Sequence, residues 1–176
     1  MKSIITSGAA LILLAAPAYS QSITEKTGVN SALSITPTTQ DFVTEVANSD
    51  MLEIQSSQLA ATKADDKDKA FAEHMIKDHT ATSDKMKELV NSGKVKANLP
   101  STMDSAHRAK LDKLRGLNGK DFSRQYEDMQ ISAHKDAVSL FQRYAKGGDS
   151  TDLKAFASAT LPTLQGHLKM AQDLEK

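Results

Sequence analysis

Cysteine is absent from this 176-residue chain, and tryptophan is absent as well. Without thiols the chain can form no disulfide, no thiolate zinc site, no iron–sulfur centre and no lipid anchor on an N-terminal cysteine. A cysteine nucleophile is excluded for the same reason. The fold must therefore be stabilised by packing rather than by covalent cross-links.

An excess of charge of one sign is also missing, because 22 Lys and Arg residues balance 22 Asp and Glu residues. This balance argues against a nucleic-acid-binding surface and against a basic face that binds membranes. No Gly-rich phosphate loop, nucleophile elbow or His-Glu-x-x-His run is present. The sequence thus supports no known enzyme class, and the protein partner or small ligand stays open.

One long apolar run is present, close to the N-terminus. Lys2 precedes an apolar stretch from Ile4 to Ala16, and the small residues Ala18 and Ser20 stand before Gln21. This pattern predicts a signal peptide over residues 1–20 and therefore a periplasmic or secreted location. An uncleaved anchor is the alternative, although the run is shorter than the ~20 residues that a spanning helix needs. No second apolar run exists, so we expect no stable membrane insertion after cleavage.

The remainder of the chain has the pattern of one helical domain. Residues 21–37 are rich in Ser, Thr, Asn and Gly and predict a flexible leader before a domain at 38–175. Cap and stop signals predict helices over about 38–62, 65–93, 103–117, 121–146 and 150–175. Pro162 is expected to kink or split the last helix. Since no segment alternates like a strand, we predict an all-α four-helix bundle with a short extra helix between its second and third long helices.

Each long helix carries one ionisable residue in the middle of its apolar stripe. At about 100° per residue, these positions are Glu53, His79, His134 and His167, in chain order. With a rise of about 1.5 Å per residue, the four lie within roughly 10 Å of one level. Because burying such groups without partners costs several kcal/mol, we expect them to meet one another or to share a ligand.

Two interpretations of these four residues are open. They can hydrogen-bond across the bundle and fix the register of the helices without binding anything. Alternatively, three imidazoles and a carboxylate can bind one transition-metal ion such as Zn, Cu or Fe. Met75 and Met170, each on the same face as the histidine of its helix, add a soft-ligand option for Cu(I), although methionine is also ordinary core filling. His74 is expected to be solvated, and His107 to pack over the bundle end.

Three groups of residues carry a family resemblance: Phe71-Ala72 with Met75 and Asp78-His79-Thr80, Phe122-Ser123-Arg124-Gln125-Tyr126 with His134, and Phe156-Ala157 with Leu161-Pro162-Thr163-Leu164 and His167-Leu168. Together they resemble the bacterial domain of unknown function DUF4142, over about residues 38–175. The resemblance implies a ferritin-like, exported domain and brings no established activity. The family pattern has Asp at the position of Ser123, so the resemblance implies no carboxylate role there.

Ferritin-like di-iron enzymes use Glu-x-x-His pairs, in which a carboxylate and an imidazole of one helix reach the same dinuclear centre. Here the residues three positions before the candidate histidines are aliphatic: Ile76, Ile131 and Leu164. A carboxylate-bridged di-iron oxidase is therefore not expected. The sequence favours a non-catalytic binding protein of the envelope or of a stress response, with a mononuclear metal protein as the alternative and an oxidoreductase third.

Overall fold

The computed structural model describes residues 33–176, so the predicted signal peptide and most of the predicted leader lie outside the described residues. The described part contains helices and no strand, which confirms the all-α prediction. The helices are α3 (Thr39–Lys63), α4 (Asp66–Asn91), α5 (Ser105–Arg115), α6 (Gly119–Gly147) and α7 (Thr151–Leu174).

Local side-chain chemistry explains where most of the helices begin. Thr38, Asp65, Asp104 and Ser150 each accept, through the side chain, a hydrogen bond from the backbone N–H three residues later. Such N-caps satisfy one of the free donors of a helix start. By contrast, α6 has no side-chain cap and begins at Gly119, two residues earlier than predicted. Gly119 has a φ of 55°, a backbone conformation that glycine adopts without strain.

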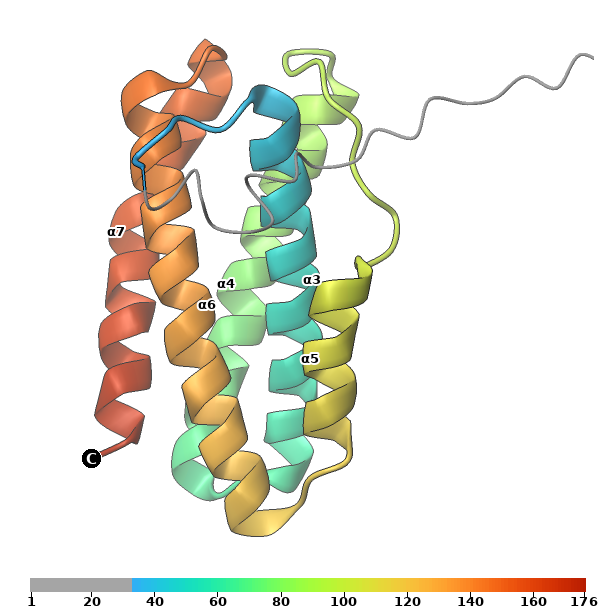
Figure 1. Cartoon of the computed structure of the whole chain (residues 1–176), viewed down its shortest axis with the longest axis vertical. Helices are drawn as coiled ribbons and strands as arrows, with labels where there is room; N and C mark the ends of the chain where they lie inside the picture. Colours follow the sequence, from blue (N-terminus) through green and yellow to red (C-terminus); the bar gives the residue numbers. More distant parts are fainter. Residues whose placement is uncertain (1–32) are drawn as a thin grey trace, which may run out of the picture.

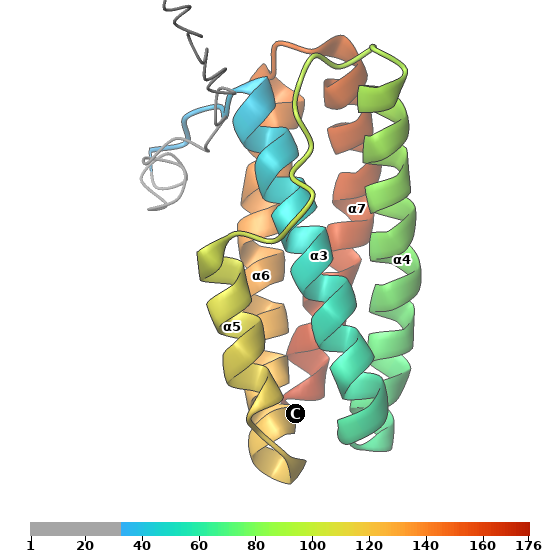
Figure 2. The same ribbon diagram turned by 90° about the vertical axis from the view of Figure 1, so that its right-hand side faces the viewer.

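The four long helices form a bundle in which every neighbouring pair is antiparallel (Figures 1 and 2). The α3 helix packs against α4 and α6, and α7 packs against the same two helices from the other side. Consequently α4 and α6 lie diagonally opposite and point in the same direction. A long connection joins them by returning along the outside of α3, and α5 completes it while packing against α3 and α6. One long crossover of this kind is the ferritin-like arrangement of a four-helix bundle.

Pro162 does not split the last helix, because α7 is continuous from Thr151 to Leu174. Proline has no N–H, so the carbonyl group of Ser158 loses its helical hydrogen bond. Both Ser158 and Pro162 are exposed. Water can therefore replace the missing bond, which explains why the split, one of the two expected outcomes, does not occur.

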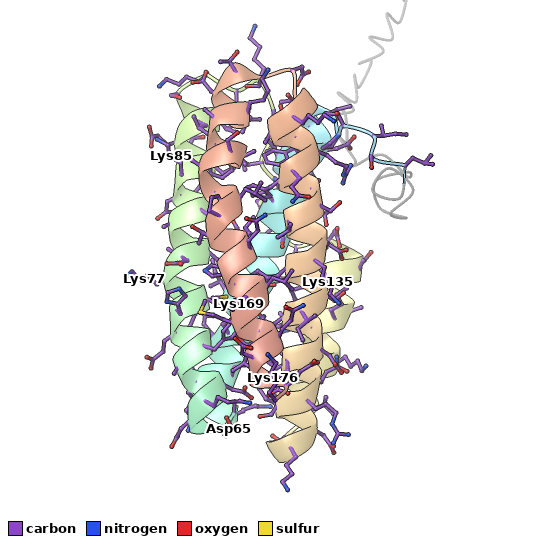
Figure 3. All side chains as sticks on the ribbon, turned by 90° about the vertical axis from the view of Figure 1, so that its left-hand side faces the viewer. Asp65, Lys77, Lys85, Lys135, Lys169 and Lys176 are labelled. Carbon is purple, nitrogen blue, oxygen red and sulfur yellow. The ribbon has the colours of Figure 1, made fainter. Side chains whose placement is uncertain are left out.

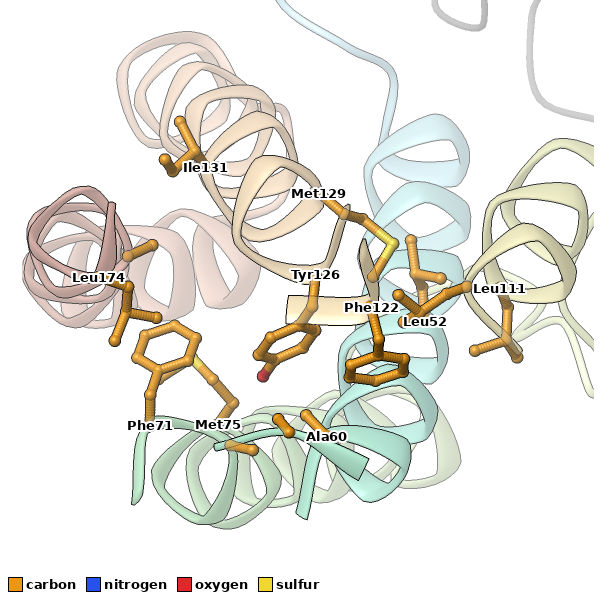
Figure 4. Packing of buried hydrophobic residues seen from close by; sticks show 14 of the residues in the cluster. Leu52, Ala60, Phe71, Met75, Leu111, Phe122, Tyr126, Met129, Ile131 and Leu174 are labelled. Atoms are coloured by element: carbon orange, nitrogen blue, oxygen red, sulfur yellow. The ribbon is translucent and has the colours of Figure 1, made fainter. Parts of the chain in front are cut away.

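The apolar interior is divided into two clusters. The lower cluster gathers around Phe122 and Tyr126, next to Phe71 and Met75 (Figure 4). The upper cluster is built around Phe42 and its neighbours from α6 and α7. Between the two clusters, a set of buried residues that we call the polar layer interrupts every long helix: Asp50, Glu53, His79, Gln130, His134 and His167. The sequence thus places three histidines and two carboxyl groups at one interior level of the bundle.

The outer surface of the bundle is covered by charged side chains. Figure 3 shows this for the face where α4, α7 and α6 lie side by side, with Lys77, Lys135 and Lys169 at the surface. Among residues 33–176, no helix is both long enough and apolar enough to cross a membrane. The residues of the polar layer, by contrast with these surface lysines, face the interior of the bundle.

Candidate metal centre

Three histidine rings meet in the middle of the bundle. The ring centroids of His79, His134 and His167 lie 5.3 to 5.5 Å from one another. All three residues are at most 3% exposed. One ring nitrogen from each histidine lies within 4.8 Å of the other two. The structure therefore brings together three of the four residues that the helix stripes predict, and we call these three the histidine triad.

Each ring of the histidine triad is held by an oxygen acceptor through one of its nitrogens. Nδ1 of His79, Nδ1 of His134 and Nε2 of His167 are the nitrogens concerned. His79 donates to Asp50 Oδ1 at 2.8 Å, and His134 donates to the backbone carbonyl oxygen of Gln130 at 2.9 Å. His167 donates to Asp78 Oδ2 at 3.0 Å. Because these oxygens accept a hydrogen bond, the proton lies on the nitrogen that they contact. The other nitrogen of each neutral ring then carries a lone pair, as in histidines that bind metals.

The spacing between two of these nitrogens fits a metal ion. Nε2 of His79 lies 3.4 Å from Nε2 of His134. A tetrahedral Zn²⁺ ion with Zn–N bonds of about 2.0–2.1 Å separates its nitrogen ligands by about 3.3–3.4 Å. Two lone pairs that face each other across this distance would repel. Either a proton or a cation must therefore stabilise the pair, and the structure is compatible with both.

Burial and neighbouring charges shift the pKa values of the three histidines in different directions. Burial, together with the charge of His79, lowers the pKa of His134 to about 3. Burial also lowers the pKa of His167 to about 4, although Asp78 opposes this effect. At neutral pH these two rings are therefore neutral and able to act as ligands.

His79 differs from the other two rings. Burial acts to lower its pKa, but the hydrogen bond and the charge of Asp50, with further support from Glu53 and Asp78, raise it overall. In the absence of a metal, His79 is thus the ring of the triad that holds a second proton best. It can donate hydrogen bonds to Asp50 and to His134 at the same time.

The fourth predicted residue, Glu53, lies in the polar layer but is not one of the three residues whose ligand atoms are mutually within 4.8 Å. Burial raises its pKa to about 7, while the charge of His79 and a hydrogen bond with Gln130 oppose this shift. Its Oε2 atom is buried and has no hydrogen-bond partner among residues 33–176. Glu53 is therefore a buried acid with one carboxyl oxygen unpaired among the described residues, and it lies beside the histidine triad rather than within it.

Asp50 and Asp78 are functional candidates that the helix stripes do not reveal. Asp50 is 3% exposed and lies one turn before Glu53 on α3, so its position could have been noticed from the three-residue spacing. Asp78 directly precedes His79 and therefore points about 100° away from it on α4. It reaches across to His167 on α7, a contact that only the packing of the two helices creates.

The remaining ligand candidates lie outside the histidine triad. His107 on α5 contacts Asp104, the N-cap residue of its helix. His74 is half-exposed, in line with a solvated position, but its ring also approaches Asp78. Met75 packs in the lower apolar cluster, and Met170 is exposed. The soft-ligand option for Cu(I) therefore gains no support from these positions.

A cavity of about 350 Å³ connects the polar layer with the surface between α3, α5 and α6. Its lining includes the buried Asp50 and His79. The same cavity is lined by Lys110, which is exposed on α5, and by His107. Water or a small molecule can therefore approach His79 from the side of the cavity.

Fold and site together define a ferritin-like bundle with three convergent, buried imidazoles. A family model described as a domain of unknown function, DUF4142, matches residues 24–174, and the chain belongs to this family. The match begins within the segment predicted to be a leader. No curated protein and no solved structure shows a significant match.

Replacing Glu53 with glutamine is expected to change how the stability of the metal-free protein depends on pH. The pKa of Glu53 is about 7 in the folded state and lies near 4.5 when the chain is unfolded. Between these values only the folded state holds the proton, so this residue lowers stability as pH rises through that window. The loss amounts to about 3 kcal/mol from pH 4.5 to 8, since each pKa unit corresponds to about 1.4 kcal/mol.

Glutamine has no proton to lose, so Glu53→Gln should be more stable than the wild type at pH 8 and nearly equal to it at pH 4.5. Urea unfolding with a chelator present, at several pH values, measures the difference. Glu73→Gln, on the exposed side of α4, is the matched control. A Glu53→Gln profile parallel to that of the wild type would show that folding does not raise the pKa of this carboxyl group.

Proposed function

We propose that this protein binds one divalent transition-metal ion through the histidine triad. The observation that supports the proposal is that each imidazole is held through one nitrogen by an oxygen acceptor and is buried with the other two rings. Such outer contacts fix the tautomer and the orientation of histidines that bind metals. In each ring the second nitrogen makes no contact with an oxygen acceptor of this kind among residues 33–176. A layer that served only to fix the register of the helices would not need this arrangement in all three rings.

The ligand set restricts the choice of metal. Neutral imidazoles bind Zn²⁺, Cu²⁺, Ni²⁺ and Fe²⁺ well, and the chain has no thiolate that would select softer ions. Three imidazoles leave at least one coordination position of a four-coordinate ion open. Glu53, whose Oε2 atom has no hydrogen-bond partner among the described residues, is one candidate on this chain for that position. Water that arrives through the cavity beside His79 is the other candidate.

A metal-free polar layer is the second candidate function of these residues. The raised pKa of His79, which is paired with Asp50, supports it, because an imidazolium at this position can hold the layer together through hydrogen bonds alone. In either case we propose an exported, non-catalytic binding protein of the envelope or of a stress response. The two candidates differ in whether a metal ion or a proton lies between His79 and His134.

Titration of the wild-type protein with Zn²⁺ or Co²⁺ tests the proposal. Protein that is purified without a chelator or a His tag, and then stripped of metal, should bind one ion per chain. Bound Co²⁺ should show the intense visible absorption of a four-coordinate site. At a free Zn²⁺ concentration of about 100 times Kd, the free energy of unfolding should rise by about 2.7 kcal/mol. Titration without saturable binding, together with unchanged thermal stability, would contradict the proposal.

A further inference from the structure

A second cluster of ligand side chains lies between the histidine triad and the surface. Nε2 of His74 is 3.3 Å from Asp78 Oδ2, and the same oxygen lies 3.0 Å from Nε2 of His167. The rings of His74 and His167 are 5.4 Å apart. Each of the three residues offers a ligand atom within 4.8 Å of the other two. Two imidazoles and a carboxylate are an ordinary ligand set for a divalent transition-metal ion.

The side chains of this second cluster become less exposed from His74 through Asp78 to His167. The side chain of His74 is 48% exposed, that of Asp78 is 25% exposed, and that of His167 is 3% exposed. The cluster therefore leads from solvent to the polar layer, through the seam where α4 packs against α7. An ion from solvent can reach His74 and Asp78 without any movement of the helices.

His167 belongs to both clusters, and its two nitrogens have different surroundings. Nε2 contacts Asp78, on the side of the second cluster. Nδ1 is buried and has no hydrogen-bond partner among residues 33–176. An imidazole that offers one nitrogen to an outer cluster and keeps another for an inner one is suited to transfer an ion from the first to the second.

We propose that His74, Asp78 and His167 form a solvent-facing docking site, at which a divalent transition-metal ion first binds and from which it passes to the histidine triad. This inference rests on the proposed function. Both steps exchange ligands and protons only, so no oxidant or reductant takes part. While the ion is bound at Nε2, the single ring proton of His167 moves from Nε2 to Nδ1, and it returns to Nε2 when Nδ1 takes the ion into the histidine triad, so the ring stays neutral throughout.

A residue that lies on the route of an ion, but not at its final site, has a characteristic kinetic effect. Its removal raises the barrier between solvent and site in both directions. The association and dissociation rates therefore fall together, while Kd stays nearly constant. Removal of a final ligand changes Kd instead, mostly through faster dissociation.

Stopped-flow measurements on wild-type, His74→Ala and His107→Ala protein test the inference. Zn²⁺ uptake is followed by the loss of signal from a zinc-responsive dye, and release is followed after addition of excess chelator. For His74→Ala we expect both rates to fall at least tenfold, with Kd within threefold of the wild-type value. His107→Ala, which removes a histidine of the cavity on the α5 side, should leave both rates unchanged.

Three results would overturn the inference, and each differs from failure of the proposed function. Unchanged rates in His74→Ala would show that the ion does not pass this residue. Slower rates in His107→Ala alone would place the route through the cavity. A large increase in Kd for His74→Ala would make His74 a final ligand. If the wild-type protein bound no Zn²⁺ at all, the proposed function itself would be wrong.

Discussion

Replacing His134 with alanine is expected to lower the affinity for Zn²⁺ at least a hundredfold. His134 is 1% exposed, and its Nε2 lies 3.4 Å from that of His79, a separation that fits two ligands of one ion. Loss of an outer hydrogen-bond partner alone typically costs 10–100-fold in metal affinity, and loss of the ligand should cost more. Competition with a chromophoric chelator of known affinity measures the change.

His107→Ala is the matched control for this variant, because it removes a histidine that lies outside the histidine triad. It should bind Zn²⁺ with wild-type affinity. In the absence of metal, His134→Ala also removes one partner of a buried network, which should cost on the order of 1–3 kcal/mol of stability. Retention of tight Zn²⁺ binding by His134→Ala would exclude the triad as the metal site, even if stability fell.

Replacing Asp50 with alanine is expected to have the next largest effect, a decrease in Zn²⁺ affinity of about 10–100-fold. The carboxylate lies 2.8 Å from Nδ1 of His79 and keeps the proton on that nitrogen, so that Nε2 is left for the metal. Without it, the ring of His79 can turn and can change its tautomer. The metal-free protein should be destabilised as well, because His79 loses the charge that stabilises its proton.

Asp50→Asn separates the two roles of this side chain. An amide oxygen still accepts a hydrogen bond from Nδ1 but does not attract the ring's positive charge as a carboxylate does. We therefore expect an affinity between those of Asp50→Ala and the wild type. The same chelator competition applies to both variants. Equal affinities in the wild type and in Asp50→Ala would show that Asp50 does not orient a metal ligand.

The fold could be predicted because its determinants are local. Side-chain caps and apolar periodicity place four long helices and a short one, with small errors at the ends, as at Gly119. The connection between α4 and α6 could not be predicted in the same way. Whether the long segment between them crosses the bundle depends on how α5 packs against α3 and α6, which no local pattern encodes.

The candidate site could also be predicted in part, because the direction in which a helical side chain points is set by the local sequence. A histidine in the centre of an apolar stripe must face the interior, so the convergence of His79, His134 and His167 follows from helix phase. Which nitrogen of each ring is left for a ligand depends on contacts between helices, such as that of Asp78 with His167. Helix phase also places Glu53 in the interior, but the neighbours that its side chain contacts are set by how the helices pack.

X-ray absorption spectroscopy of the one-to-one Zn²⁺ complex identifies the atoms that bind the ion. We expect imidazole scattering from three ligands, with Zn–N distances of about 2.0–2.1 Å. One further nitrogen or oxygen ligand is expected, since three imidazoles leave a four-coordinate ion incomplete. A spectrum with oxygen ligands only, or with the same imidazole contribution in His134→Ala as in the wild type, would contradict metal binding by His79, His134 and His167.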